Sequence, residues 1–435
     1  MASPLMRRLL RGGIMALIIK VGAAGFQFLM FLMLARAMGK AEYGLFGFGF
    51  SLATLLAVGG SFGQRMLSLR FLGIYASEDK PLLAAGVIRN GFRIVVGGTA
   101  VVSLLCALVL PVFKPGLDIG FLLLTGVFAI ILALAEYFSF VLRSYGGMTL
   151  SLAPRDVIWR ALVTLAALPF AFGLLPQMNA AWGMVMITVL LFICIFGQTL
   201  MHAATRPHAL LRAPAQYEHK RWLQAAWGLW GTSFVQIAAP NLTIVILGLL
   251  LSPEETGPVF AALRIAALLN LFLLAANMVA SPLISRFYHE KKFADLQRTC
   301  TAIAVLSSVT AGLIFVLLMF EGRFFLNLFG PGFAMAHPEL VIVAAAYVVN
   351  TLTGPTSALL ELSGHERAAF RMITITNVIA MAAMPFATWS FGSVGAACCL
   401  AFSIIGWNVQ AVVYARRNVG VDPSVFGLFY KGRGA

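Results

Sequence analysis

Long apolar segments recur along the whole chain and constrain its fold more than any other feature. Each carries few charges and is about 20 residues or longer, the length that a helix needs to cross a hydrocarbon layer of about 30 Å. Charged residues make up 11% of the 435 residues, against about 25% in soluble domains. Twelve segments of helical length fall near residues 13–36, 44–66, 87–112, 119–142, 155–175, 180–201, 223–250, 258–283, 300–320, 338–361, 367–390 and 393–415. We therefore predict an all-α polytopic membrane protein with twelve transmembrane helices.

The placement of lysine and arginine predicts the orientation of these helices. If the N-terminus lies in the cytoplasm, 25 of the 31 basic residues fall on cytoplasmic tails, loops and helix ends. The far side then receives four basic residues, Arg36, Lys40, Lys114 and Arg323. This bias agrees with the positive-inside rule, so we predict that both termini are cytoplasmic. The net charge of +15 then reflects topology and contact with anionic lipid, and we predict no nucleic-acid partner.

The two halves of the chain resemble each other. Residues 34–44 match residues 247–257 at a constant offset of 213, and the offset drifts to 216 further on. Each half has a helix, a tight outer turn ending in Glu-X-Gly, a second helix and a basic amphipathic segment. Because six helices is an even number, the two copies would be pseudo-symmetric about an axis along the membrane normal. We predict an N-terminal six-helix bundle at 1–201, a cytoplasmic linker at 202–222 and a C-terminal six-helix bundle at 223–435.

Two cations lie inside the predicted spanning helices, Lys20 in the first and Arg264 in the eighth. A cation in hydrocarbon costs about 2.5–3.5 kcal/mol on insertion scales, so it is usually tied to function or firmly paired. At the usual helical rise, each lies about 12 Å along its helix. The structural alternative is that Lys20 extends to the cytoplasmic interface and that Arg264 pairs with a carboxylate.

Glu136, in the fourth predicted helix, is a further candidate, and Arg143 follows it by two turns. A carboxylate at this depth could be a protonatable coupling site. It could instead neutralise Arg93, Arg143 or Arg160 near the inner face, and we favour this second interpretation.

Five stretches, in order along the twelve helices, carry a family resemblance. They are LMFLMLARAMGKAEYGLFGFGFSLATLLAVGGSFGQRMLSLRF, LTIVILGLLLSPEETGPVFAALRIAALLNLFLLAANMVASPLISRFYHEKK, FLNLFGPGFAMAHPEL, GPTSALLELSGHERAAF and FGSVGAACCLAFSIIGWNVQAVVYARR. They resemble the polysaccharide transporter branch of the multidrug/oligosaccharidyl-lipid/polysaccharide exporter superfamily. The resemblance implies a flippase that moves undecaprenyl-pyrophosphate-linked oligosaccharide repeat units across the bacterial inner membrane by alternating access. The products would be O-antigen, capsule or exopolysaccharide, and a polysaccharide polymerase and chain-length proteins would be partners.

The same resemblance assigns roles to the basic residues. Flippases of this superfamily line a central cavity with cations that receive the lipid diphosphate, and helices 1 and 8 flank a lateral opening for the lipid tail. Lys20 and Arg264 would take this role, with Arg264 as a bidentate fork and Lys20 as a mobile point charge. Apart from the resemblance, a further basic group lies at the cytoplasmic ends of helices 3 to 5 and could form a vestibule for the incoming pyrophosphate. Its residues are Arg89, Arg93, Arg143, Arg155-Asp156 and Arg160. The positive-inside bias alone would also place them there.

Polar amides and tryptophans within the helices have structural explanations. We attribute the amides mainly to interhelical hydrogen bonds, although any of them could contact sugar hydroxyls. Three tryptophans at the start of helix 7 are typical of an interfacial belt. These residues are Gln27, Gln236, Asn241, Asn270, Asn277, Asn350, Asn377, Asn408, Trp222, Trp227 and Trp230.

Three other functions remain open from the sequence. A cation-coupled multidrug exporter of the same superfamily would need buried carboxylates in the first half, where helices 1 and 2 offer Glu42 at the outer turn. A membrane-embedded polysaccharide-synthesis enzyme would need a larger outer loop than 37–43 or 251–257. A non-transporting scaffold is the third alternative. The sequence contains no Walker motif, so we predict that no cofactor is needed and that ATP is not the direct energy source.

Overall fold

The computed structural model describes the backbone of residues 4–145, 148–206 and 214–430. Side chains are described within these ranges from Gly22 onward, apart from Met148 and Val279. All regular secondary structure in the described ranges is helical. Nine of the helices there are long and apolar enough to cross a membrane. The side chain of Lys20, one of the predicted site residues, lies outside the described residues.

The nine long helices account for eleven of the twelve predicted segments, because two of them each contain two segments. These two are α1 (Pro4–Gly60) and α15 (Glu366–Tyr414). The remaining predicted segment, near 155–175, forms α5 (Met148–Ala153), the π-turn η1 (Pro154–Ile158) and α6 (Trp159–Ala171). The predicted all-helical, twelve-segment architecture is therefore confirmed.

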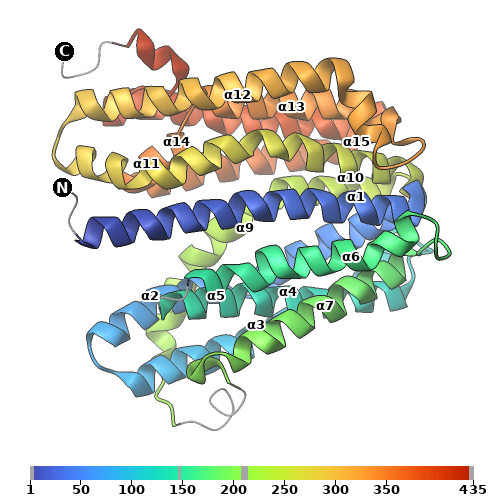
Figure 1. Cartoon of the computed structure of the whole chain (residues 1–435), viewed down its shortest axis with the longest axis horizontal. Helices are drawn as coiled ribbons and strands as arrows, with labels where there is room; N and C mark the ends of the chain where they lie inside the picture. The colour runs from blue at the N-terminus through green and yellow to red at the C-terminus, as the bar shows by residue number, and fades with distance from the viewer. Residues whose placement is uncertain (1–3, 146–147, 207–213, 431–435) are drawn as a thin grey trace. The chain divides into compact units, whose positions relative to one another are not determined.

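The other described helices are α2 (Gln64–Ser77), α3 (Pro81–Phe113), α4 (Ile119–Ser144), α7 (Ala180–Leu200), η2 (Ala203–Thr205), α9 (His219–Leu250), α10 (Pro253–Ala266), η3 (Ala267–Asn270), α11 (Leu271–His289), α12 (Phe293–Asn327), η4 (Phe333–Ala336), α13 (His337–Leu352), α14 (Thr356–Leu362), η5 (Ala415–Val419) and η6 (Val425–Leu428). Figure 1 shows that the long helices within each part of the chain run side by side as a bundle.

Breaks between helices occur at matching positions in the two halves. α1 breaks at Gly39, whose φ of +72° is readily adopted only by glycine. The aligned residue 213 positions later, Ser252, caps α10 in a capping box with Glu255. α15 breaks at Gly392, with a φ of +62°. The residue 213 positions before Gly392 is Asn179, which caps α7 by accepting a hydrogen bond from an amide of that helix. The internal duplication thus extends to the helix termini.

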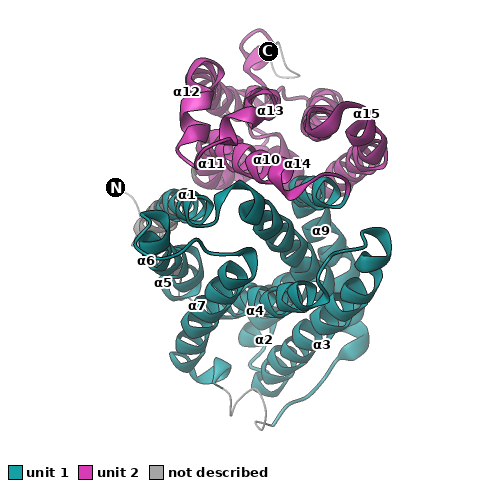
Figure 2. Cartoon of the chain, turned by 90° about the vertical axis from the view of Figure 1, so that its right-hand side faces the viewer, with its two compact units in different colours: residues 1–249 teal, residues 250–435 magenta. Residues whose placement is uncertain are grey.

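The chain divides by its contacts into two compact units, residues 1–249 and residues 250–435 (Figure 2). This division places α9 with the first unit. The predicted boundary at 202–222 instead follows the sequence duplication, and it stays a prediction.

Small residues allow the helices of the first unit to pack closely. A Cβ on Gly60 of α1 would lie 2.4 Å from the Cα of Thr99 in α3. A Cβ on Gly91 of α3 would lie 2.4 Å from the hydroxyl of Tyr137 in α4, and this hydroxyl donates to the carbonyl of Ile88. Apolar side chains on the outside, such as Leu108 at 61% exposed, suit contact with lipid tails.

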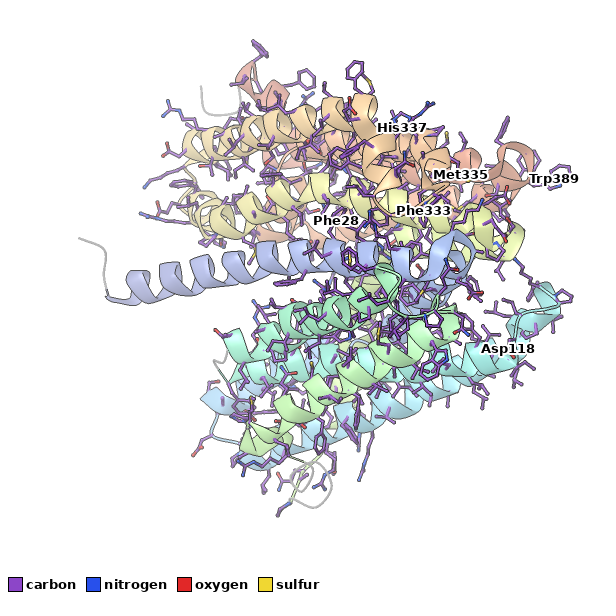
Figure 3. All side chains as sticks on the ribbon, turned by 45° about the vertical axis from the view of Figure 1, so that its right-hand side comes forward. Phe28, Asp118, Phe333, Met335, His337 and Trp389 are labelled. Carbon is purple, nitrogen blue, oxygen red and sulfur yellow. The ribbon has the colours of Figure 1, made fainter. Side chains whose placement is uncertain are left out.

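The second unit packs α11, α12, α14 and α15 around buried apolar residues such as Leu359 and Cys300. Its α12–α13 connection and the α15 break lie at the same end of the unit, where Figure 3 labels Met335, His337 and Trp389. At the C-terminus, the backbone amide of Asp422 donates to Gln297 of α12, and the Asp422 carboxylate pairs with Arg416. The segment after α15 is therefore fastened to the bundle.

Candidate functional site

Glu136 of α4 lies between two arginines of the first unit. Arg65 Nη1, from the first turn of α2, is 2.6 Å from Glu136 Oε2, and Arg155 Nη1 of η1 is 3.7 Å from Oε1. Arg155 Nε also donates to Asp156 Oδ1 at 2.8 Å. All four side chains are largely withdrawn from solvent, with Asp156 at 2% exposed. Two cations and two carboxylates thus form a compact network with balanced charge.

An irregular turn positions Arg155 and Asp156. They lie in η1, a π-turn that begins at Pro154. Proline has no N–H to donate to the preceding turn, and wide turns of this kind recur at functional sites. These two consecutive side chains meet as an ion pair.

The sequence predicted a different set of partners for Glu136. The expected partners were Arg93, Arg143 and Arg160, but the structure pairs Glu136 with Arg65 and Arg155. Arg93 and Arg143 are exposed. The favoured interpretation, that Glu136 neutralises basic residues, is consistent with these contacts. A coupling role for Glu136 stays a prediction.

Arg65 is the member of this network that sequence reasoning missed. From the sequence, Arg65 contributes only to the positive-inside bias, because it lies at the end of the second predicted spanning helix, 44–66. In the structure, Gly63 adopts a φ of +71° and separates α2 from α1. The available signal for a separate α2 was Gly63, which comes two residues before Arg65 at the end of a long apolar run. A glycine at this place favours a turn.

Arg160 reaches from α6 to α1. Its Nη1 donates a 2.8 Å hydrogen bond to the backbone carbonyl of Ala23. Ala23 is 3% exposed, so this contact is made inside the first unit. Ala23 follows Lys20 by three residues, nearly one helical turn. Two of the predicted site residues, Arg160 and Lys20, therefore belong to neighbouring turns of α6 and α1.

Arg264 lies in the last turn of α10, in the second unit. Its guanidinium carbon is 4.5 Å from the ring centroid of Phe260, one turn earlier, which is a cation–π contact. The residue is partly exposed, and it lies within a segment apolar enough to span a membrane, Pro253–Met278. The helix changes to the 3₁₀-turn η3 three residues later.

A chain of amides follows this turn. Asn350 of α13 donates to Asn270 of η3 at 2.9 Å, and Asn408 of α15 donates to Asn350 at 2.8 Å. The hydroxyl of Thr353 donates to Asn408 at 2.9 Å. Asn377 accepts a short hydrogen bond from Ser403 across the break of α15 at Gly392, so this bond joins the eleventh and twelfth predicted segments. The prediction that such amides bond between helices is confirmed for Asn270, Asn350, Asn408 and Asn377, and the first three of these tie η3, α13 and α15 together.

Trp222 does not belong to an interfacial belt, contrary to the sequence prediction. It is 2% exposed, and its indole Nε1 donates to the hydroxyl of Tyr75 in α2 at 2.9 Å. The Tyr75 hydroxyl in turn donates to the Glu218 carboxylate at 2.8 Å. The start of α9 is thereby held against α2. Burial raises the pKa of the Tyr75 hydroxyl, whereas the hydrogen bond from Tyr75 and that from Arg221 lower the pKa of Glu218.

Comparison with known proteins gives a fold. No protein-family model matches the chain, and no curated protein matches it. An inward-facing multidrug resistance MATE family transporter of the MOP superfamily has a TM-score of 0.72 at 12% identity, covering 93% of this chain and 98% of that one. The lipid II flippase MurJ, in an inward closed conformation, has a TM-score of 0.73 at 14% identity, covering 93% and 87%. This chain has the fold of these transporters.

A third solved structure extends the comparison. The MATE multidrug transporter DinF-BH, solved as a complex, has a TM-score of 0.64 at 17% identity and covers 98% of this chain and 97% of that one. The fold of the superfamily named by the sequence resemblance is thus confirmed. The fold is common to drug transporters and to a lipid-linked flippase, so the substrate has to be argued from the residues of this chain.

Proposed function

We propose that the chain is a flippase for an oligosaccharide linked to a polyprenyl diphosphate, which it moves across the bacterial inner membrane by alternating access. The observation that carries this proposal is Arg264, a cation in a candidate membrane span. Its guanidinium carbon lies 4.5 Å from the centroid of the Phe260 ring. The N–H groups at the edge of a guanidinium are those that grip a phosphate with two parallel hydrogen bonds.

The basic residues of the first unit support an anionic substrate. Arg160 extends into the bundle toward the turn of α1 that follows Lys20. Glu136, the carboxylate that a cation-coupled exporter could use, is engaged by two arginines. A lipid diphosphate would compete with Glu136 for these guanidinium groups, because phosphate oxygens accept the same charge-assisted hydrogen bonds.

In the proposed mechanism, the diphosphate leaves the cytoplasmic leaflet and binds to arginines of the inward-open protein while its polyprenyl tail stays in the bilayer. Arg93 and Arg143, both exposed, increase the local concentration of the anion. Lys20 and Arg264 then offset its charge at depth, where water is scarce and the electrostatic attraction is larger. Glu136 is the candidate coupling site, because its carboxylate contacts both Arg65 and Arg155.

The second candidate function is export of cationic drugs. It is favoured by the inward-facing MATE family transporter, whose fold is as similar to this chain as that of MurJ. The two candidates differ in the charge of the substrate. An exporter of cations would be opposed by the positive charge at Arg264 and Arg160, because like charges repel strongly in a low dielectric.

A reconstitution experiment separates the two candidates. The purified chain in proteoliposomes is supplied either with a polyprenyl-diphosphate-linked oligosaccharide or with a cationic rhodamine dye. Movement of the lipid is measured by its accessibility to a membrane-impermeant glycosidase, and movement of the dye by its fluorescence. We expect the chain to move the lipid above the rate of protein-free vesicles and to leave the dye where it was added. Dye transport without lipid transport would overturn the proposal.

A further inference from the structure

The first unit contains a cavity of about 320 Å³ between α3, α9 and the α1–α2 turn. Aromatic side chains form much of its wall. The lining residues include Phe62, Trp222, Trp227 and Trp230. Phe62 and Trp230 stack with ring centroids 5.8 Å apart, and Trp230 Nε1 donates to the carbonyl of Gly59 at 2.9 Å. The wall is therefore held in place by contacts of its own.

The mouth of the cavity faces the side of the bundle. Leu223 and Trp227 line it and are 62% and 56% exposed, respectively. They lie in the first three turns of α9, at the end predicted to be cytoplasmic, and tryptophan there is typical of the membrane interface. A lipid of the cytoplasmic leaflet can thus reach the cavity from the side of the bundle.

One polar atom in the cavity wall has no partner among the described residues. Gln64 lines the cavity and is 3% exposed, and its Oε1 accepts no hydrogen bond there. A buried acceptor left unsatisfied costs about 1–3 kcal/mol, so natural proteins rarely keep one without a purpose. A ligand with a hydroxyl or ammonium donor would satisfy it.

The lining of the site and the charge near it select its occupant. Most of the lining side chains are apolar or aromatic, which suits a hydrocarbon chain. Arg93 follows the lining residue Asn90 by three positions, and Lys220 precedes Leu223 by three, so each is one helical turn from the wall. Both are exposed cations, which attract an anionic headgroup.

We propose that this cavity binds one anionic phospholipid of the cytoplasmic leaflet. An acyl chain lies between the rings of Trp222, Trp227 and Trp230, the phosphate lies near Arg93 and Lys220, and a headgroup donor reaches Gln64 Oε1. Because the cavity joins α3 to α9, the bound lipid braces the start of α9, which also carries the Trp222–Tyr75 hydrogen bond.

Native mass spectrometry of the purified full chain tests the proposal. Phosphatidylglycerol and phosphatidylcholine with the same acyl chains are added in parallel. We expect one phosphatidylglycerol to be retained with about a tenfold or greater preference, since two cations near the membrane surface supply at least this selectivity. Leu223→Trp narrows the mouth and should lower retention about tenfold. Leu165→Trp is the matched control, because Leu165 of α6 is similarly exposed at 60% and lies outside the cavity. Gln64→Leu should weaken retention of phosphatidylglycerol more than that of phosphatidylcholine.

Two further arms keep the test decisive. If Leu223→Trp does not fold, quenching of tryptophan fluorescence by brominated acyl chains is measured instead. The contribution of Trp227 is the difference in fluorescence between the natural sequence and Trp227→Phe. This contribution should be quenched more by brominated phosphatidylglycerol than by brominated phosphatidylcholine. Polyprenyl phosphate is added as a competitor. Equal retention of phosphatidylglycerol in Leu223→Trp and Leu165→Trp, or equal retention of the two phospholipids by the natural sequence, would overturn the proposal. Preferential displacement by polyprenyl phosphate would assign the cavity to the substrate tail instead.

Discussion

Arg65 and Glu136 form an ion pair of 2.6 Å although 71 residues separate them in the sequence. Their side chains are 13% and 22% exposed, so little water screens the pair. Arg65 also lies over the ring of Phe140, 5.8 Å from its centroid. The pair therefore joins the short basic helix α2 to the spanning helix α4.

Replacing either partner of this ion pair should lower the free energy of unfolding, and the effect of one replacement should depend on whether the other partner is present. Glu136→Gln and Arg65→Met are each expected to lower the thermal unfolding temperature in detergent. A double-mutant cycle should give a coupling free energy of about 1–3 kcal/mol, since hydrogen bonds between charged groups are worth this much. Additive effects of the two changes would show that the contact is not maintained in the protein.

The asparagine chain of the second unit should stabilise its helix packing. Asn350 both donates to Asn270 and accepts from Asn408. Interhelical hydrogen bonds in membranes average about 0.6 kcal/mol each, so Asn350→Leu should destabilise the protein by about 1 kcal/mol. Asn418→Leu is the control, because Asn418 is exposed and bonds to its own helix at Tyr414. Equal unfolding temperatures for the two variants would contradict the role of the chain.

Glu290, after α11 and outside the candidate spans, should make stability depend on acidic pH. Hydrogen bonds from Arg286 and then Lys292 lower its pKa from 4.5 to about 2. Because the folded-state pKa is depressed, the stabilisation is complete above about pH 4.5 and is lost as the pH falls toward 2. The advantage of the natural sequence over Glu290→Gln in unfolding temperature should therefore shrink across this window. An advantage that stays constant down to pH 2 would contradict the assignment.

Gly63 should not tolerate a side chain. Its φ of +71° is unfavourable for other residues, and a Cβ would lie 2.8 Å from the backbone nitrogen of Trp230 and 2.9 Å from the carbonyl of Ala226. Gly63→Ala should therefore displace α9 from the α1–α2 turn and lower the yield of folded protein. Gly73→Ala serves as the control, since a Cβ there meets no atom within 4 Å. Similar behaviour of both variants in size-exclusion chromatography would argue against this close approach.

Much of the fold could be predicted because the membrane imposes it. Spanning helices need long apolar runs, and their orientation follows from the basic residues, so the number and order of helices can be derived from composition along the chain. The duplication also aligned the turn at Gly39 with the turn at Ser252 in the sequence. The fifth predicted segment, near 155–175, was harder to predict, because periodicity does not reveal that a π-turn begins at Pro154.

The candidate site was less predictable. The Glu136 carboxylate can pair with any nearby arginine. Which arginine pairs with it depends on how the helices are rotated relative to one another, and this rotation cannot be derived from the sequence. Arg143 lies two turns after Glu136, yet it is exposed, and Arg65 from another helix makes the contact. Trp222 was misassigned for a related reason. Tryptophan at the end of a spanning helix is typical of the membrane interface. The sequence does not reveal that Tyr75, 147 residues away, accepts a hydrogen bond from its indole.

The most direct test of the proposed function measures flipping by variants of Arg264. Proteoliposomes containing the natural sequence, Arg264→Ala or Arg264→Lys are supplied with a polyprenyl-diphosphate-linked oligosaccharide, and its appearance in the opposite leaflet is followed with an impermeant glycosidase. We predict that Arg264→Ala lowers the rate about tenfold or more while the protein stays folded, and that Arg264→Lys restores part of it, because lysine keeps the charge without the bidentate fork. Flipping by Arg264→Ala at the natural rate would contradict the account.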